Sequence, residues 1–217
     1  MQNFATVYST DSTTPVTNGG LTYEFTEDRD YRSQYYQIRE SCYKRHWGLK
    51  VFSGAEDSHD QQGDILIVRD GRKVVGGGRV VYRHSDETQK LLPMETEQFL
   101  LHTAVPEIGA DRMLLGEIGR VAILPEYQGQ KASKIGICLL ARAQACGCRY
   151  VTTVAPVHQA LTYIRKAKYY GIDIQMLEGV PVADHPFYNH IDMKLLFCDI
   201  GSSELKSLPD FRFLLQE

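Results

Sequence analysis

The fold of this chain is decided by the stretch Leu115-Gly116-Glu117-Ile118-Gly119-Arg120-Val121-Ala122-Ile123-Leu124-Pro125. Its run of aliphatic residues, ended by Pro125, predicts a core strand. Residues 126–133, Glu-Tyr-Gln-Gly-Gln-Lys-Ala-Ser, then form a polar turn that leads into an apolar helix. The strand nevertheless carries two charges, and ionised groups are rarely buried unless they are paired or used. Glu117 and Arg120 are therefore candidate functional residues.

The spacing of these two charges makes a structural demand. Residues three apart on a strand point to opposite faces, so Glu117 and Arg120 can share one cleft only if a bulge intervenes. The turn after Pro125 also presents backbone N–H groups at a helix start, which is a favourable site for phosphate. The stretch thus combines a charged strand with a phosphate-type turn.

Composition places the chain among ordinary soluble globular proteins. Its 217 residues are 43% apolar and 24% charged, with a net charge of −3 and a pI near 6.2. This balance argues against a general nucleic-acid binder. No apolar run approaches the roughly 18 residues that span a bilayer, and no signal peptide is evident. The expected location is cytoplasmic, without stable membrane insertion.

The five cysteines support that location. Cys146 and Cys148 lack a second ligand pair at zinc spacing, so no metal site is expected. All five are predicted to be free thiols in apolar segments, which fits a reducing compartment.

Periodicity and turn residues divide the chain into alternating elements. Residues 1–20 are predicted to be a flexible leader, and residues 21–217 a single domain. Strands are predicted at 21–25, 64–68, 73–81, 113–124, 149–155, 172–177 and 190–197, helices at 30–47, 95–103, 133–145 and 157–168, and a docked tail at 199–217. This order predicts an α/β (α+β) protein with a mixed sheet and helices on both faces.

Three further features are candidates for a site. Arg39 lies on the first predicted helix, where a surface salt bridge is the simpler interpretation. The loop with Glu56, Asp57 and Asp60 is either a solvated acidic turn or a site for a cationic amine or an Arg partner. Arg79 follows three glycines that indicate a bulge or a close backbone approach. It is either exposed or directed into a cleft.

The order strand, Pro, polar turn, helix, strand, Pro, helix, Tyr-Tyr-Gly resembles the core of the GNAT acyltransferases. This resemblance implies a mostly antiparallel sheet with a splayed parallel strand pair that receives the pantetheine arm of the donor. The family's turn reads Gln/Arg-x-x-Gly-x-Gly/Ala, whereas this chain keeps Gln128 but has Lys131 and Ser133 at the glycine positions. That departure favours an acyl-phosphopantetheine donor carried on acyl carrier protein over acetyl-CoA.

Within that fold, the chain is similar to the acyl-homoserine-lactone synthases and the N-acyl amino acid synthases. The residues that carry the similarity occur in the family order within residues 31–133: Arg39, Tyr43, Trp47, Asp57, Asp60, Arg79, Glu117 and Arg120. Lactone synthases resemble one another in an Arg-Leu-Leu-Pro-Thr run after the glycines, but Arg79 is followed here by Val-Val-Tyr-Arg. Leu91-Leu92-Pro93-Met94-Glu95 looks more like the amino acid branch.

The resemblance implies a role for each catalytic candidate. Glu117 would be the base that takes a proton from the attacking amine, directly or through a water. Arg120 would orient Glu117 or stabilise charge, and a backbone N–H near Ala122 would stabilise the oxyanion. Arg39 and Arg79 would either bind the carboxylate of an amino acid or hold the acidic loop.

The remaining candidates are walls and binding groups. Asp57 and Asp60 are expected to fix their loop by pairing with Arg39 or Arg79. Tyr43 and Trp47 are expected to wall the acceptor pocket, with core packing as the alternative. The positions assigned to the phosphopantetheine are Val121, Ile123, Gln128, Lys131 and Ser133.

The implied function is transfer of a long-chain fatty acyl group from acyl carrier protein to the α-amine of an amino acid. The alternatives are lactone formation from S-adenosylmethionine, acetyl-CoA-dependent acetylation, and acyl binding without catalysis. An acidic carrier would meet a basic surface. The candidates for that surface are Lys131, Lys134, Arg142, Arg165, Lys166 and Lys168.

Overall fold

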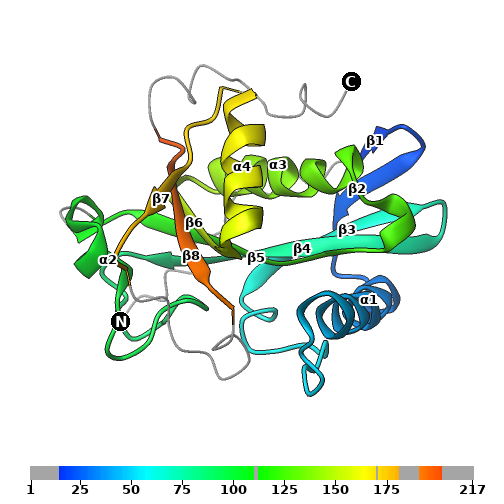
Figure 1. Cartoon of the computed structure of the whole chain (residues 1–217), viewed down its shortest axis with the longest axis horizontal. Coiled ribbons are helices and arrows are strands. Elements are labelled where there is room, and N and C mark those ends of the chain that lie inside the picture. The colour runs from blue at the N-terminus through cyan, green and yellow to red at the C-terminus, as the bar shows by residue number, and fades with distance from the viewer. Residues whose placement is uncertain (1–14, 110–111, 170, 181–190, 202–217) are drawn as a thin grey trace, which may run out of the picture.

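A computed structural model describes residues 15–109, 112–169, 171–180 and 191–201 (Figure 1). One sheet organises these residues, with the strand order β1-β2-β3-β4-β5-β6-β8-β7. In chain order the elements are β1 (Val16–Asn18), β2 (Leu21–Phe25), α1 (Arg29–Trp47), β3 (Gly63–Asp70), β4 (Lys73–His84), α2 (Leu101–Ala104), η2 (Pro106–Gly109), β5 (Leu114–Ile123), η3 (Pro125–Tyr127), α3 (Gln130–Ala145), β6 (Cys148–Pro156), α4 (Val157–Tyr169), β7 (Gln175–Leu177) and β8 (Met193–Asp199).

The predicted fold class is confirmed. β5 and β6 pair in parallel, and every other neighbouring pair in the sheet is antiparallel. The parallel ladder runs from Leu114 opposite Cys148 only as far as Glu117 opposite Thr152. Beyond that pair β5 continues to Ile123 and β6 to Pro156, so the two strands part in the middle of the sheet.

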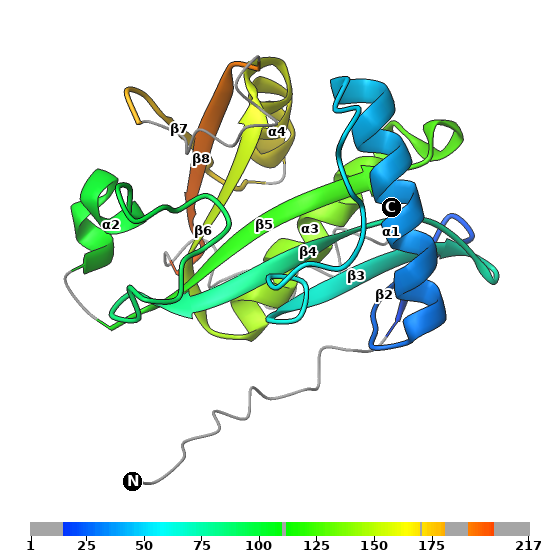
Figure 2. The same cartoon turned by 90° about the horizontal axis from the view of Figure 1, so that it is seen from below.

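Helices cover both faces of the sheet. α1 lies on one face and α3 and α4 lie on the other, as Figures 1 and 2 show from two directions. α1 begins where the Asp28 carboxylate accepts hydrogen bonds from the backbone N–H groups of residues 30 and 31, and it ends at Gly48 in the left-handed region. Both are favoured helix boundaries, which is why this helix follows the prediction closely.

The largest difference from the sequence prediction lies between β4 and β5. The helix predicted at residues 95–103 is wrong, because only Leu101–Ala104 are helical. The Glu95 carboxylate accepts hydrogen bonds from the backbone N–H groups of Leu92 and Leu101 and is paired with Arg83. These buried bonds fix an irregular loop, and tertiary contacts of this kind override helix propensity.

The chain ends differ from the prediction in smaller ways. The hairpin of β1 and β2 begins at Val16, inside the predicted leader, while residues 1–14 lie outside the described part. Likewise the predicted tail is described only to Gly201. α3 begins at Gln130, three residues before the prediction, and β7 is shorter than predicted.

The cysteines and the helices can also be compared with the expectations from the sequence. All five cysteines are free thiols, and four of them are buried. In the described ranges, no helix combines the length and the apolar composition needed to cross a membrane.

Candidate functional site

A β-bulge on β5 brings the two strand charges to one face. Gly77 lies opposite Ala122, but Arg79 lies opposite Gly119, so β5 carries an extra residue between them. Arg120 adopts φ +57°, which is uncommon for a residue with a side chain. This bulge is the geometry that the spacing of Glu117 and Arg120 demanded.

Ion pairs show which face the two charges share. Arg79 and Arg120 both pair with Asp57, which belongs to the loop after α1. Val81 lies opposite Glu117 and is two residues from Arg79, so Glu117 and Arg79 also occupy one face. The bulge therefore gathers Glu117, Arg79 and Arg120 on the α1 side of the sheet.

Glycines on β4 make room for this arrangement. A Cβ at Gly77 would lie 2.3 Å from the carbonyl oxygen of Leu66 and 2.8 Å from the ring of Tyr35. A Cβ at Gly78 would lie 2.9 Å from Leu139, on the other face of the sheet. The glycines thus permit close approach from both faces, as their run in the sequence indicated.

Arg39 holds the loop after α1. Its guanidinium donates two hydrogen bonds to the Asp60 carboxylate, at 2.9 and 2.8 Å, and others to the carbonyls of Gly54 and Ala55. Arg39 and Asp60 are buried, with exposed fractions of 1% and 0%. Of the two predicted roles for Arg39, this geometry favours the one that holds the loop.

Asp57 and Asp60 connect that loop to the sheet. Arg79 donates to Asp57 at 2.5 Å and to Asp60 at 2.7 Å, and Arg120 lies 3.7 Å from Asp57. Burial acts to raise the pKa of Asp60, but its hydrogen bonds with Arg39 and the nearby Arg79 charge outweigh burial and hold this pKa below its usual value. Asp60 therefore stays ionised and, with Asp57, fixes the position of Arg79.

Glu117 is a buried carboxyl group with an elevated pKa. Its side chain is 5% exposed and accepts a hydrogen bond from the Met94 backbone N–H at 2.9 Å. Burial raises its pKa to about 8, although the Met94 bond and the charges of Arg79 and Arg120 act in the opposite direction. A carboxyl group with this pKa can exchange a proton near neutral pH.

The Met94 N–H is positioned by a buried ion pair that sequence reasoning missed. Arg83 and Glu95 pair through two side-chain hydrogen bonds, and both side chains are 0% exposed. Arg83 also donates to the carbonyls of His84 and Ser85. The only signal in the sequence was Glu95 at the start of a weak helical pattern. Because a helix was predicted there, Glu95 was not recognised as a partner of Arg83.

An aromatic group lies beside the bulge. The ring of Tyr43 stacks between those of Trp47 and Phe52, with centroids at 5.1 and 4.6 Å. The Arg120 guanidinium lies 5.0 Å from the Phe52 ring centroid. Tyr43 and Trp47 therefore belong to one stacked aromatic group, and Phe52 is a member that the sequence did not indicate.

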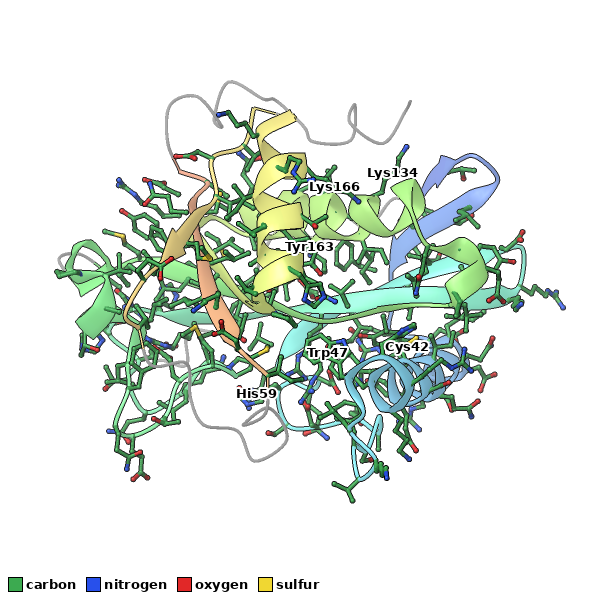
Figure 3. The ribbon with its side chains drawn as sticks, in the orientation of Figure 1. Cys42, Trp47, His59, Lys134, Tyr163 and Lys166 are labelled. Atoms are coloured by element: carbon green, nitrogen blue, oxygen red, sulfur yellow. The ribbon has the colours of Figure 1, made fainter. Side chains whose placement is uncertain are left out.

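A cavity of about 200 Å³ crosses the sheet where β5 and β6 part. It is reached by Tyr43 and Trp47 on one side and by Tyr163 and Lys166 on the other, and Figure 3 shows these last two on α4. Further lining residues come from β5, α3 and β6: Ile118, Gly119, Arg120, Val121, Gly136, Ile137, Leu140, Val151, Thr152, Thr153 and Val154. Its walls are mainly apolar, so it suits an extended apolar group.

The cavity includes some predicted site residues and leaves out others. Arg120 and Val121 line it, whereas Glu117 does not. Ala122 lies opposite Gly77 and packs with Tyr35, and Ile123 is buried in the core, so neither reaches the cavity. On β5 the cavity is therefore lined by residues 118–121, which include the predicted Arg120 and Val121.

The predicted phosphate turn leads directly into α3. Gly129 precedes the helix with φ +92°, and Gln128 is exposed with its amide 3.5 Å from the His46 ring. Lys131 and Ser133 lie in the first turn of α3, and their side chains are outside the described part. The turn therefore lies directly after the end of β5.

The predicted basic surface needs correction at two positions. Lys134 and Arg142 are each 8% exposed, and Arg142 donates to Asp64 at 2.7 Å. Both face the protein interior because α3 packs on the sheet. The exposed members are on α4: Arg165, Lys166 and Lys168.

One family model matches slightly less than half of the chain. The family model described as "Acetyltransferase (GNAT) domain" matches residues 38–136. Among curated proteins, no sequence matches the chain significantly. The matched segment contains α1, the bulge and the turn into α3.

Several solved structures share the fold. FeeM, an N-acyl amino acid synthase from uncultured soil microbes, has a TM-score of 0.58 at 12% identity, covering 87% of this chain and 93% of FeeM. BjaI, a CoA-dependent acyl-homoserine lactone synthase, has a TM-score of 0.55 at 20% identity, covering 82% of this chain and 80% of BjaI. The AHL synthase LasI has a TM-score of 0.52 at 16% identity, covering 83% of this chain and 90% of LasI. At these identities the likeness concerns the fold.

Proposed function

We propose that this chain, which carries a GNAT acetyltransferase domain, is an N-acyltransferase that moves a fatty acyl group from acyl carrier protein to the α-amine of an amino acid. FeeM, similar in fold over most of both chains, is an N-acyl amino acid synthase. The two reactants would enter the parted strands from opposite faces of the sheet.

One observation carries this proposal: the apolar cavity between β5 and β6 lies next to Glu117 on the strand. Residues from both faces of the sheet line it, so a donor arm and an amine can meet inside. The parting of the strands begins after Glu117, which puts the carboxyl group at the edge of the gap. The parting of β5 and β6 therefore both opens the cavity and places the proton-accepting group beside it.

The proposed reaction is acyl transfer from a thioester to an amine. The amine attacks the thioester carbonyl, a C–N bond forms, the C–S bond breaks, and the thiol leaves on the phosphopantetheine arm. The amine must first lose a proton, and Glu117 is the group suited to accept it because its pKa is about 8. Since Glu117 does not line the cavity, the proton passes through a water molecule.

The acceptor site consists of Arg120 and the aromatic wall. Arg120 lines the cavity and is 20% exposed, whereas Arg39 is directed to Asp60 and backbone carbonyls. A carboxylate on the acceptor can form charge-assisted hydrogen bonds with Arg120. Tyr43 and Trp47 would contact an apolar side chain of the amino acid.

The donor would dock on α4. Lys166 lies at the cavity rim, and the exposed Arg165 and Lys168 flank it on the same helix. A phosphodiester at the end of the arm would meet this positive charge and the turn at Gly129. A carrier protein presents one phosphodiester here, without the nucleotide that CoA adds.

The test is mass spectrometry of lipid extracts from cells that express the wild type, Glu117→Gln or Glu126→Gln. Glu126 is an exposed carboxylate in the turn after the same strand and serves as the matched control. Long-chain N-acyl amino acids from the wild type and the control, and none from Glu117→Gln, are the expected result.

Purified protein then identifies the donor and acceptor classes. The same acyl group is offered on acyl carrier protein and on CoA, each with an amino acid mixture or with S-adenosylmethionine. Acyl lactone products would show that the chain is an acyl-homoserine-lactone synthase. Products from acyl-CoA alone would refute the carrier-protein donor. Lack of any turnover with all four combinations would refute the acyltransferase function.

A further inference from the structure

Gly136 occupies an unusual place in α3. It lies within the helix, six residues after the start at Gln130 and nine residues before the end at Ala145. Glycine destabilises a helix interior relative to alanine, because it gives up more backbone freedom on folding. Its presence there needs a reason outside the helix.

Close packing does not supply that reason. A Cβ at Gly136 would meet no heavy atom within 4 Å, whereas a Cβ at Gly78 would lie 2.9 Å from Leu139 of the same helix. Gly136 has no positive φ that would demand glycine. The position therefore accepts a side chain without a clash.

The space beside Gly136 is the cavity. Gly136 lines it together with Ile137 and with Leu140 one turn later. Further walls are the apolar Ala167, Ile172 and Leu196, which come from α4, the segment after it and β8. A side chain on residue 136 would project into the volume between these walls.

We propose that Gly136 determines the largest acyl group that the cavity admits. This inference rests on the proposed acyltransferase function. Apolar walls on several elements favour a methylene chain, and the missing side chain on α3 leaves the width that such a chain occupies. Gly136 is thus a specificity-determining residue, and its effect is steric.

The test compares wild type, Gly136→Ala, Gly136→Leu and Ala145→Leu. Ala145→Leu adds the same bulk to an exposed position at the end of the same helix and is the control. The donors are butanoyl and dodecanoyl thioesters of acyl carrier protein. Unfolding temperatures are measured in parallel, and both Gly136 variants should melt at or above the wild-type temperature because the helix loses a glycine.

For Gly136→Leu we expect kcat/KM with the dodecanoyl donor to fall at least about tenfold, while kcat/KM with the butanoyl donor stays within about twofold. The kcat/KM of Gly136→Ala with the dodecanoyl donor should lie between those of Gly136→Leu and the wild type. The Ala145→Leu control should have the wild-type kcat/KM with both donors. An unchanged chain-length profile would overturn the inference. Equal loss with both donors in a folded Gly136→Leu protein would overturn it too, because the residue would then face the part common to all donors.

Binding separates this inference from the proposed function. If the wild type transfers neither acyl group, the proposed function fails, and calorimetric titration with dodecanoate and butanoate tests the cavity directly. Dodecanoate binding that Gly136→Leu weakens at least about tenfold would support the steric role. Absent or equal dodecanoate binding in both proteins would refute it.

Discussion

The hydroxyl of Tyr35 donates a hydrogen bond to the backbone carbonyl of Arg120, with an O–O distance of 2.6 Å. Tyr35 is fully buried on α1, and Arg120 is the bulge residue with positive φ. The bond joins residues that are 85 positions apart in the chain. It holds the bulge in place from the face on which Arg120 and Glu117 lie.

Tyr35→Phe should destabilise the protein and weaken the site. The carbonyl of Arg120 would lose a buried partner, which costs about 1–3 kcal/mol in the free energy of unfolding. Urea denaturation measures this cost. Tyr36→Phe is the control, because its hydroxyl makes only a 3.5 Å contact with the exposed Glu56. Equal stability of the two variants would show that the bond does not hold the bulge.

Glu117 should make stability depend on pH. Its pKa is about 8 in the folded protein, against an ordinary value of 4.5. Between pH 4.5 and about pH 8, the folded protein therefore keeps a proton on Glu117 that the unfolded chain has lost. The free energy of unfolding should therefore decrease as pH rises from about 4.5 to about 8, relative to Glu117→Gln. Thermal unfolding of both proteins at several pH values measures the difference. Parallel curves would contradict the elevated pKa.

The same group should control the rate. If ionised Glu117 accepts the proton of the amine, kcat/KM should rise with pH and level off above about 8. Glu117→Gln should lose about 10²–10⁴ in kcat/KM and lose this inflection. A variant that keeps the wild-type pH profile would exclude Glu117 as the base.

The Arg83–Glu95 pair should be essential for stability. Glu95→Leu would leave a buried guanidinium without its partner, which costs about 3–5 kcal/mol. The exposed pair of Arg112 and Asp86 is the control, and Asp86→Ala should cost less than about 1 kcal/mol. Denaturant titration compares the two. A small effect of Glu95→Leu would mean that the loop above Glu117 is held by other contacts.

The glycines of β4 should differ from a glycine of β5. Gly77→Ala places a Cβ against the Leu66 carbonyl and the Tyr35 ring and should cost about 1–3 kcal/mol. Gly119→Ala meets no atom within 4 Å and should stay within about 0.5 kcal/mol of the wild type. Equal losses in the unfolding free energy would contradict the close approach of Tyr35.

Local patterns in the sequence specify several elements of the fold. Helical periodicity and capping residues specify α1, and β-branched runs around a Gly turn specify the hairpin of β3 and β4. Two charges in an apolar strand singled out Glu117 and Arg120 and required a bulge. These features depend on residues close together in the chain, so they can be read from it.

Other features depend on residues that are distant in the chain, and they can be seen only in the folded protein. The bulge needs Tyr35 and the β4 glycines, and the loop at Glu95 needs Arg83, so helix propensity there is overridden. Burial of Lys134 and Arg142 follows from how α3 packs on the sheet. The cavity and the pKa of Glu117 arise from the parting of β5 and β6 and from desolvation, because both depend on what surrounds a residue in space.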